Sequence, residues 1–250
     1  MIKQQLKREI VTFMNQYREA KKLPLFWGEP ILKFASAKDP MFHDLKTVVM
    51  ESHYLPTDFL PEAVTVLSYF LPFTEEVGKS NVEEYASSYE WAKAYVETNA
   101  LAEALNQHIV AFLQEQGILA HAPVGIGMVS KDVAMSRWSQ RHVAYIAGHG
   151  TFGLNNMLIS EKGCVGRYYS VITALSIEPD QVVKEERCLY KKNGACKLCV
   201  KRCITGALTE TGFDRFRCLE QCMENEKRYQ DADVCGKCIV GVPCSYRVYP

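Results

Sequence analysis

Apolar residues recur at helical spacing at the start of the chain and again in its middle. The periodicity over residues 2–20 predicts a helix with one apolar face, and the pattern over residues 88–116 predicts a longer amphipathic helix. Gly117 follows the second pattern and is a natural stop, because glycine readily adopts the left-handed conformation that ends many helices. The apolar positions of the first helix are Ile2, Leu6, Ile10, Phe13 and Tyr17.

Continuous runs of apolar and β-branched residues predict strands elsewhere. Residues 63–73, "AVTVLSYFLPF", are suited to a strand covered on both faces, and residues 166–175 predict a second strand. A short strand interrupted by proline and glycine is predicted within residues 118–129, and a helix over residues 136–147. Helices and strands are therefore mixed up to about residue 180, which predicts an α/β fold of the α+β kind.

The composition and the residue pattern of the chain change after about residue 180. From about residue 187 the gaps between cysteines are short, glycine is frequent, and little room is left for regular elements. The polar segment "SIEPDQVVKEE" separates the part with mixed helices and strands from the cysteine-rich part. We therefore predict a boundary there, with one domain over residues 1–180 and a second over residues 181–250.

The composition of the chain bears on whether the cysteines form disulfides or bind metal. A chain of 28.4 kDa with 48% hydrophobic residues can bury a full core without disulfide staples. The N-terminus is charged and has no apolar signal-peptide region, and no run of about 18 apolar residues suggests a membrane span, so we expect a cytoplasmic protein. Thiols stay reduced in that compartment, which favours metal ligands or redox groups over disulfides.

The net charge argues against a large nucleic-acid interface. Lys plus Arg and Asp plus Glu both number 29, which is not the balance of a protein that neutralises many phosphates. Lys and Arg outnumber Asp and Glu between Lys184 and Arg228. This local excess suits either the docking of an acidic electron donor or the compensation of negatively charged clusters.

Cysteine spacing is the most specific signal in the sequence. The chain has 10 cysteines, and all except Cys164 lie from Cys188 onward. C-x2-C pairs occur at Cys196 and Cys235, and the first pair is followed after three more residues by Cys203. In two-cluster ferredoxins, the cysteine at the end of such a run crosses over to ligate the other cluster. The pattern therefore predicts two [4Fe-4S] clusters that exchange ligands.

This rule assigns most of the ligands. Cys218 and Cys222 lie at i and i+4, so spacing alone leaves open which of them is a ligand, and Cys164 is expected to be a small buried residue. The first cluster is predicted at Cys188, Cys196, Cys199 and Cys244. The second is predicted at Cys203, Cys235, Cys238 and one of Cys218 and Cys222.

Zinc is the main alternative. Two C-x2-C pairs separated by a few tens of residues can build tetrahedral sites of four thiolates. Zinc ribbons carry two such pairs and nothing more, however, whereas the run of x2 and then x3 is the ferredoxin pattern. A disulfide framework is a weaker alternative still.

A glycine-rich segment precedes the cysteines. Gly148, Gly150 and Gly153 would let the backbone approach a ligand closely, and exposed backbone N–H groups there are suited to a phosphate or an amide-rich cofactor. A plain tight turn explains the same glycines equally well. His149 lies within the segment, where it is suited to a hydrogen-bonding loop role or to a cobalt ligand.

The segment Ala147–Asn155, "AGHGTFGLN", resembles "AGLGWIGKN" in the epoxyqueuosine reductase family, which is related to the reductive dehalogenases. In that family this stretch precedes a ferredoxin module, and "FDRFRC", which ends at Cys218, resembles the segment before its fifth cysteine. The resemblance covers about residues 60–244. It favours Cys218 as a ligand.

The resemblance implies a nitroreductase-like domain that binds cobalamin in its base-off form, followed by a bacterial two-cluster ferredoxin-like domain. Arg141 and His142 lie on the helix predicted before the glycine segment, where they are suited either to contact phosphate or propionamide groups of a cofactor or to face solvent. The cofactor-binding residues that the resemblance implies are Gly148, His149, Gly150, Thr151, Phe152, Gly153, Leu154 and Asn155.

The chain departs from the family pattern in several places. The family's acidic proton donor aligns with Ala134, which leaves Asp132, two residues away, as the candidate catalytic acid. Leu154 replaces a basic residue, and Ile204 replaces the proline after the fourth cysteine. The chain also stops at Pro250, without the helical-repeat extension that family members acting on tRNA carry. These departures argue against epoxyqueuosine in tRNA as the substrate and against nucleic acid as a partner.

We therefore predict a cobalamin-dependent iron–sulfur oxidoreductase in which two clusters pass electrons to cobalt for reduction of a small molecule or a corrinoid. The alternative is an electron-transfer protein or reductive activator of a corrinoid protein, without a substrate of its own. The expected partners are a low-potential donor such as ferredoxin or flavodoxin, and in the alternative a corrinoid protein. Reduction of epoxyqueuosine in tRNA is the least favoured of the three.

Overall fold

A four-stranded antiparallel sheet forms the centre of the protein. The computed structural model describes residues 2–83, 85–123 and 132–249. The strands are β1 (Ile31–Ser36), β2 (Thr65–Pro72), β6 (Gly166–Thr173) and β3 (Ala120–His121), in the order β1-β2-β6-β3. The central pair β2 and β6 runs in register, with Phe70 opposite Tyr168 and their rings stacked at 4.4 Å.

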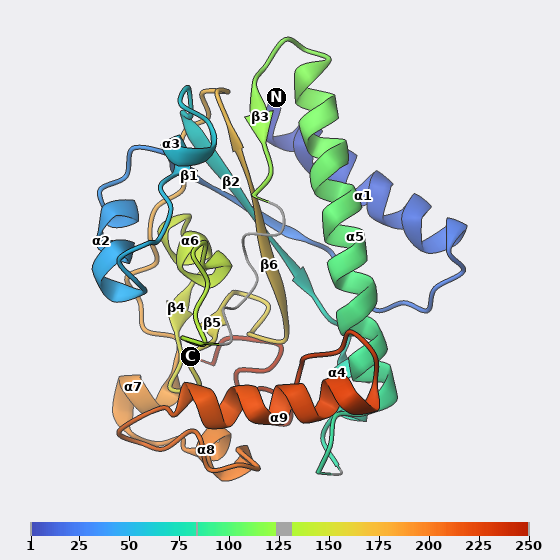
Figure 1. The fold of residues 1–250 in the computed structure, drawn as a ribbon, viewed down its shortest axis with the longest axis vertical. Coiled ribbons are helices and arrows are strands. Elements are labelled where there is room, and N and C mark those ends of the chain that lie inside the picture. The colour runs from blue at the N-terminus through green and yellow to red at the C-terminus, as the bar shows by residue number, and fades with distance from the viewer. Residues whose placement is uncertain (1, 84, 124–131, 250) are drawn as a thin grey trace.

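Helices cover both faces of this sheet (Figure 1). Helices α1 (Ile2–Ala20) and α5 (Tyr89–Gln114) pack together against one face, and α2 (Met41–Val48) and α6 (Gln140–Ile146) lie on the other. The predicted helices at residues 2–20 and 88–116 are confirmed. Ser88 caps α5 by accepting a hydrogen bond from the Trp91 N–H, and Gly117 has the left-handed φ of +73° that was expected of a stop.

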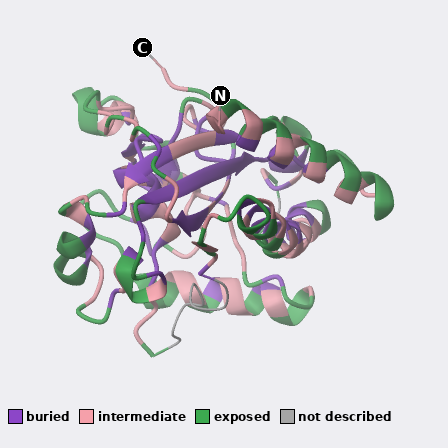
Figure 2. Ribbon diagram, turned by 90° about the horizontal axis from the view of Figure 1, so that it is seen from above, coloured by how far each residue is buried: buried purple, intermediate pink, exposed green. Residues whose placement is uncertain are grey.

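Strand β2 shows why its sequence is continuously apolar. Every residue of β2 is buried, because successive side chains point to opposite faces and both faces are covered (Figure 2). Leu67 and Tyr69 join the hydrophobic cluster of α1 and α5, whereas Val66 joins that of α2 and α6. The predicted strand at residues 63–73 is therefore confirmed, as is the one at residues 166–175.

Other predicted elements are shorter than expected. The strand predicted within residues 118–129 is limited to β3 among the described residues, and residues 124–131 lie outside them. Helix α6 starts after Ser139 rather than at residue 136, because the Ser136 hydroxyl holds a turn by bonding the backbone N–H and C=O of Trp138. The remaining short elements are α3 (Pro56–Phe59), α4 (Glu75–Ser80), β4 (Thr151–Phe152) and β5 (Leu158–Ile159).

The cysteine-rich segment packs below the sheet in Figure 1. It contains α7 (Leu189–Asn193), α8 (Leu198–Arg202) and the 14-residue α9 (Arg215–Arg228), so it holds more regular structure than we expected. Ile239 and Val240 from this segment lie in the same hydrophobic cluster as residues of α1 and α5. None of the described helices is long and apolar enough to cross a membrane.

Candidate metal centre

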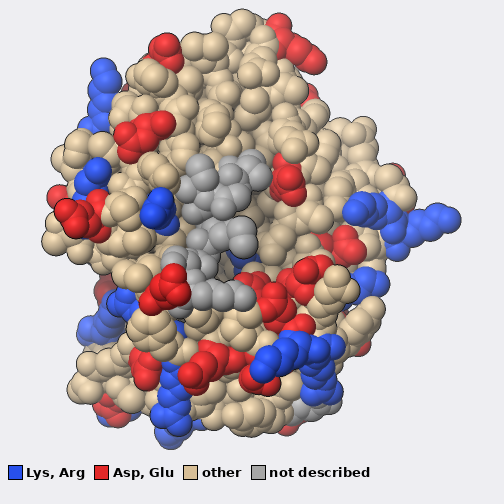
Figure 3. All heavy atoms as spheres, in the orientation of Figure 1, with Lys and Arg blue, Asp and Glu red and all other residues tan. Residues whose placement is uncertain are grey.

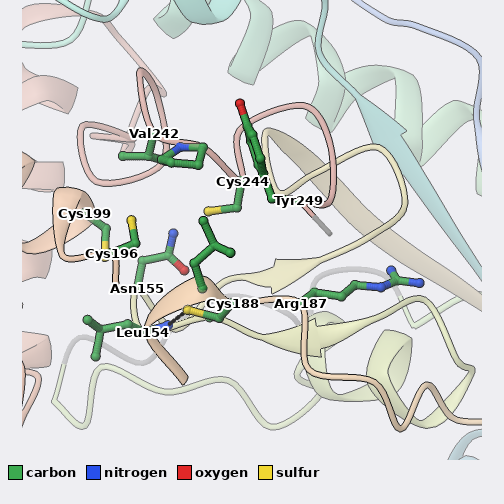
Figure 4. A pocket seen from close by; sticks show the side chains of 12 residues that line it. Leu154, Asn155, Arg187, Cys188, Cys196, Cys199, Val242, Cys244 and Tyr249 are labelled. Atoms are coloured by element: carbon green, nitrogen blue, oxygen red, sulfur yellow. Dashed lines mark hydrogen bonds between the residues drawn. The ribbon is translucent and has the colours of Figure 1, made fainter. Parts of the chain in front are cut away.

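The four cysteines predicted for the first cluster line one pocket (Figure 4). The pocket encloses about 400 Å³ of space, part of it open to solvent. Its thiols come from separate parts of the chain, since Cys188 precedes α7, Cys199 lies in α8 and Cys244 lies near the C-terminus. The four cysteines, which we call the first group, are Cys188, Cys196, Cys199 and Cys244.

Backbone and side-chain groups hold Cys188 in this pocket. The Leu154 N–H donates to the Cys188 Sγ at 3.4 Å, which is the dashed contact in Figure 4. The Cys188 N–H in turn donates to the Glu186 carboxylate at 2.8 Å. These two hydrogen bonds fix the position of Cys188 at the wall of the pocket.

A second set of thiols lies close together beside the first. Burial is the main cause that raises the pKa of Cys238, and the neighbouring thiols of Cys235, Cys218 and Cys203 raise it further. Burial likewise raises the pKa of Cys235 to about 11, with contributions from Cys218 and Cys203. These four cysteines, the second group, are therefore close enough to act on one another electrostatically.

Cys218 and Cys222 lie one turn apart on α9, and their thiols are hydrogen-bonded to each other. The Arg141 guanidinium lies near Cys218, and Cys235 is close enough to act electrostatically on both thiols. Both cysteines therefore lie beside the second group, and the choice of Cys218 as the ligand stays a prediction from the resemblance seen in the sequence.

Cys164 is fully buried, as expected, but its surroundings are not those of an ordinary core residue. Its Sγ lies 4.0 Å from the Sγ of Cys244, and its N–H donates to the Cys244 backbone carbonyl at 3.0 Å. This contact could not be predicted from the sequence, because the two cysteines are 80 positions apart. Cys164 therefore packs against Cys244 of the first group and helps to hold it in position.

The donor set fits two iron–sulfur clusters. A [4Fe-4S] cluster takes one thiolate at each of four iron atoms, so its ligands surround a space and do not meet at one point. Both groups consist of thiols alone. Within the described ranges, no three His, Cys, Asp or Glu side chains converge on a position that would hold a single metal ion.

The first half of the glycine segment is packed against the protein itself. A Cβ at Gly150 would overlap the backbone carbonyl of Ile159, and one at Gly148, where φ is +85°, would overlap that of Gln181. The N–H groups of Gly148, His149 and Gly153 donate to backbone carbonyls within the chain. These residues therefore make a tight internal turn and do not form a cradle for a cofactor.

His149 is buried and neutral. Its Nε2–H donates to the Ser68 carbonyl at 3.2 Å, and burial lowers its pKa to about 3. Thr151 donates its hydroxyl to Glu186, and Phe152 packs on the His142 ring at 4.8 Å. The side chains of Thr151 and Phe152 are thus engaged within the protein, as is the Nε2 of His149, whereas the buried Nδ1 of His149 has no hydrogen-bond partner among the described residues.

The second half of the segment belongs to the cysteine centre. Gly153, Leu154 and Asn155 all line the pocket of the first group. The Asn155 side-chain amide donates to the Cys238 carbonyl at 3.5 Å and approaches the Cys164 Sγ at 3.9 Å. Sequence analysis missed this role, because it depends on a fold that brings the loop against residues more than eighty positions away.

Arg141 and His142 also differ from expectation. The Arg141 guanidinium donates to the Asn156 carbonyl and the Met157 sulfur, and it lies near the thiols of the second group. His142 Nδ1 is 2.7 Å from the Ser139 hydroxyl. Burial lowers the pKa of His142 to about 4, so it is neutral at physiological pH.

The candidate acid Asp132 is exposed. Ala134, at the position of the family's proton donor, is half-buried in a turn with φ of +50°. Residues 124–131, which precede Asp132, lie outside the described residues.

Comparison with known proteins bears on the fold. No protein-family model matches the chain, and no curated protein matches it. Among solved structures, epoxyqueuosine reductase from Streptococcus thermophilus matches with 18% identity and a TM-score of 0.56, over 96% of this chain and 68% of that one. The chain has the fold of the epoxyqueuosine reductases.

Two further epoxyqueuosine reductase structures agree. The enzyme from Bacillus subtilis matches at 17% identity with a TM-score of 0.53, and a complex with an epoxyqueuosine-modified tRNA-Tyr stem loop matches at 18% and 0.53. Each match covers 94% of this chain and 66% of the other, so the chain spans about two thirds of the epoxyqueuosine reductase length. The resemblance seen in the sequence is confirmed for the fold.

Proposed function

We propose that this protein is an iron–sulfur oxidoreductase that holds one [4Fe-4S] cluster on each of the two cysteine groups. The observation that carries the proposal is the single pocket that all four cysteines of the first group line. The fold shared with the epoxyqueuosine reductases supports it. An all-thiol donor set suits iron–sulfur clusters and makes thiolate ligands available without any other residue type.

The two groups adjoin, which suits electron transfer. Cys199 of the first group and Cys238 of the second lie in one small hydrophobic cluster, and the charge of Cys199 contributes to the raised pKa of Cys238. Clusters held there would be neighbours. Leu154 and Asn155 line the pocket of the first group, and Asn155 also donates to the Cys238 carbonyl in the second group.

The first test is the electron capacity of the protein. Anaerobic titration with dithionite is expected to take up about two electrons per chain, one for each cluster, with EPR signals of two interacting reduced clusters. Cys199→Ser should remove one of these electrons, because it breaks a ligand of the first group alone. A protein that takes up no electrons would refute the proposal.

Base-off cobalamin is the electron acceptor that the resemblance implies, and when bound it would supply a cobalt centre for reductive chemistry. The glycine segment does not fit the role of its cradle, since its first half is packed internally. We therefore assign no step to cobalamin. The test is titration of the cluster-loaded protein with cobalamin: stoichiometric binding with a base-off spectrum supports a cobalamin-dependent reductase, and no binding supports the electron-transfer protein instead.

Reduction of a modified nucleoside in tRNA is the second candidate, because a protein of this fold is known in complex with an epoxyqueuosine-modified stem loop. The face drawn in Figure 3 intersperses Lys and Arg with Asp and Glu and shows no large basic patch. Binding of that stem loop, measured at low and high salt, tests this candidate. A substrate should bind with an affinity that falls as salt rises and be converted to queuosine, whereas no binding at low salt would exclude it.

A further inference from the structure

Trp91 is the exception among the three tryptophans of the chain. It lies in the first turn of α5, is only 2% exposed, and packs edge-on against Phe73 at 5.3 Å. Its indole Nε1–H is buried, and among the described residues it has no acceptor. A buried donor left without an acceptor costs about 1–3 kcal/mol, so native proteins rarely contain one without a reason.

The other two tryptophans show what a satisfied donor looks like in this fold. Trp27 donates its indole N–H to the Thr98 hydroxyl at 2.7 Å. Trp138 donates its own to the Ser170 hydroxyl at 3.0 Å. Both rings are as deeply buried as that of Trp91. The missing acceptor at Trp91 is therefore specific to its position.

The indole of Trp91 lies against the second cysteine group. Its nitrogen-bearing edge faces Gly236, the residue that follows Cys235 in the turn to Cys238, and a Cβ at Gly236 would lie 2.8 Å from Nε1. Gly236 has φ of +75°, and only a glycine leaves room there for the ring. The fold thus holds an unpaired N–H beside the turn between two predicted cluster ligands.

The backbone of this turn does not supply the missing acceptor. The carbonyl oxygens of Cys235, Gly236 and Lys237 each accept a hydrogen bond from another part of the chain. No other described carbonyl and no cysteine sulfur accepts a hydrogen bond from Nε1 either. The acceptor therefore has to arrive with the cluster, and the sulfides of the cluster are such acceptors.

We propose that the Trp91 Nε1–H donates a hydrogen bond to a sulfide of the cluster held by the second group. The inference rests on the proposed function, since it requires that cluster. Hydrogen bonds to cluster and ligand sulfurs stabilise the more negative, reduced state and so raise the reduction potential. Trp91 is then a positioning and tuning residue that α5 contributes to the ferredoxin-like segment.

The test is Trp91→Phe, which keeps an aromatic ring in the core and removes the donor. With both clusters loaded, one of the two is expected to become harder to reduce, its reduction equilibrium constant falling several-fold and at most about tenfold, or about 59 mV for one electron. The matched control is Trp27→Phe, which removes an indole donor that already has a protein acceptor and should leave both potentials unchanged. Unchanged potentials in fully loaded Trp91→Phe would overturn the inference.

A measurement on the unaltered protein covers the case in which Trp91→Phe loads iron poorly. In the reduced, ¹⁵N-tryptophan-labelled protein, pulsed EPR is expected to detect an exchangeable proton and an indole ¹⁵N coupled to one cluster, with the couplings retained in Trp27→Phe. If both clusters are visible by EPR but no such couplings are found, the proposed role of Trp91 is wrong and the proposed function stands. A protein without any cluster would contradict the proposed function instead.

Discussion

At the residue scale, the pair Cys218 and Cys222 offers a direct test of the ligand assignment. Their thiols are hydrogen-bonded to each other on α9, and the resemblance seen in the sequence favours Cys218 as the ligand. We expect Cys218→Ser to lose one of the two clusters, leaving about four iron atoms per chain, and Cys222→Ser to keep about eight. Iron and sulfide analysis of the anaerobically purified variants measures this. If iron is lost from Cys222→Ser only, Cys222 is the ligand and Cys218 is not.

Gly150 tests whether the glycine segment is structural. A Cβ there would overlap the Ile159 carbonyl, which is backbone and cannot move aside cheaply. Gly150→Ala is therefore expected to lower the free energy of unfolding by about 1–3 kcal/mol, measured by anaerobic denaturant titration.

The matched control for Gly150 is Gly212→Ala, because the nearest atom to a Cβ at Gly212 is a threonine hydroxyl at 3.7 Å. Its unfolding free energy should stay within about 0.5 kcal/mol of the starting protein. Equal stability of the two variants, together with lost cofactor binding in Gly150→Ala, would instead support a ligand cradle.

Local sequence could not decide this role for the glycines. Three close glycines are compatible with an exposed cradle or an internal turn, and the choice depends on which residues pack against them. Here the neighbours are Ile159 and Gln181, which arrive from other parts of the chain. The unpaired indole of Trp91 was invisible for the same reason, since 145 positions separate it from Gly236, the difference between their residue numbers.

At the scale of elements, sequence pattern succeeded where burial is regular over many residues. Helices α1 and α5 and strands β2 and β6 each extend over several periods of their own pattern, so tertiary context only reinforces them. Strand β1 was missed because its burial does not alternate regularly. The two-residue strands β4 and β5 exist through their pairing with one another, which no local pattern encodes.

Helix α9 carries a second-group ligand, and its N-terminal cap provides a prediction. The Asp214 carboxylate accepts hydrogen bonds from the N–H groups of Phe216 and Arg217 at 3.1 and 3.0 Å. Asp214→Ala should cost about 1 kcal/mol of stability and speed the loss of iron to a chelator, because Cys218 lies in the turn that the cap fixes. Both quantities are measured on the anaerobic, cluster-loaded protein.

Asp214→Asn is the matched control for this cap, since it removes the charge and keeps a capping oxygen. It should retain nearly the full stability and the slow release of iron. If Asp214→Asn behaved like Asp214→Ala, the effect would be one of charge near the cluster and not of helix capping.

At the scale of the whole molecule, the cysteine segment and the sheet share one core. Ile239 and Val240 lie in the cluster formed by α1 and α5, and the side chains of Asn81 and Ser87 donate to the Cys235 carbonyl. We therefore expect iron removal to lower the melting temperature of the entire chain in anaerobic calorimetry. A melting temperature of the sheet region that is unchanged after iron removal would show that the two parts fold independently.

The grouping of the cysteines could be predicted in large part, because the ligands of iron–sulfur clusters follow characteristic short spacings along the chain. The grouping of Cys188 and Cys199 with the distant Cys244 followed from the ferredoxin rule, and the structure brings these thiols to one pocket. The support around them was not predictable. Arg141 and Asn155 reach the thiols through the fold, and their sequence neighbourhoods contain no cysteine spacing that would indicate it.

The iron, sulfide and zinc contents of the purified protein decide whether the two cysteine groups hold two [4Fe-4S] clusters. Protein purified without oxygen should be brown and contain about eight iron and eight sulfide per chain, with negligible zinc. Cys203→Ser and Cys235→Ser should deplete one cluster, and Cys188→Ser and Cys244→Ser the other. About two zinc ions per chain, with no sulfide, would contradict the account.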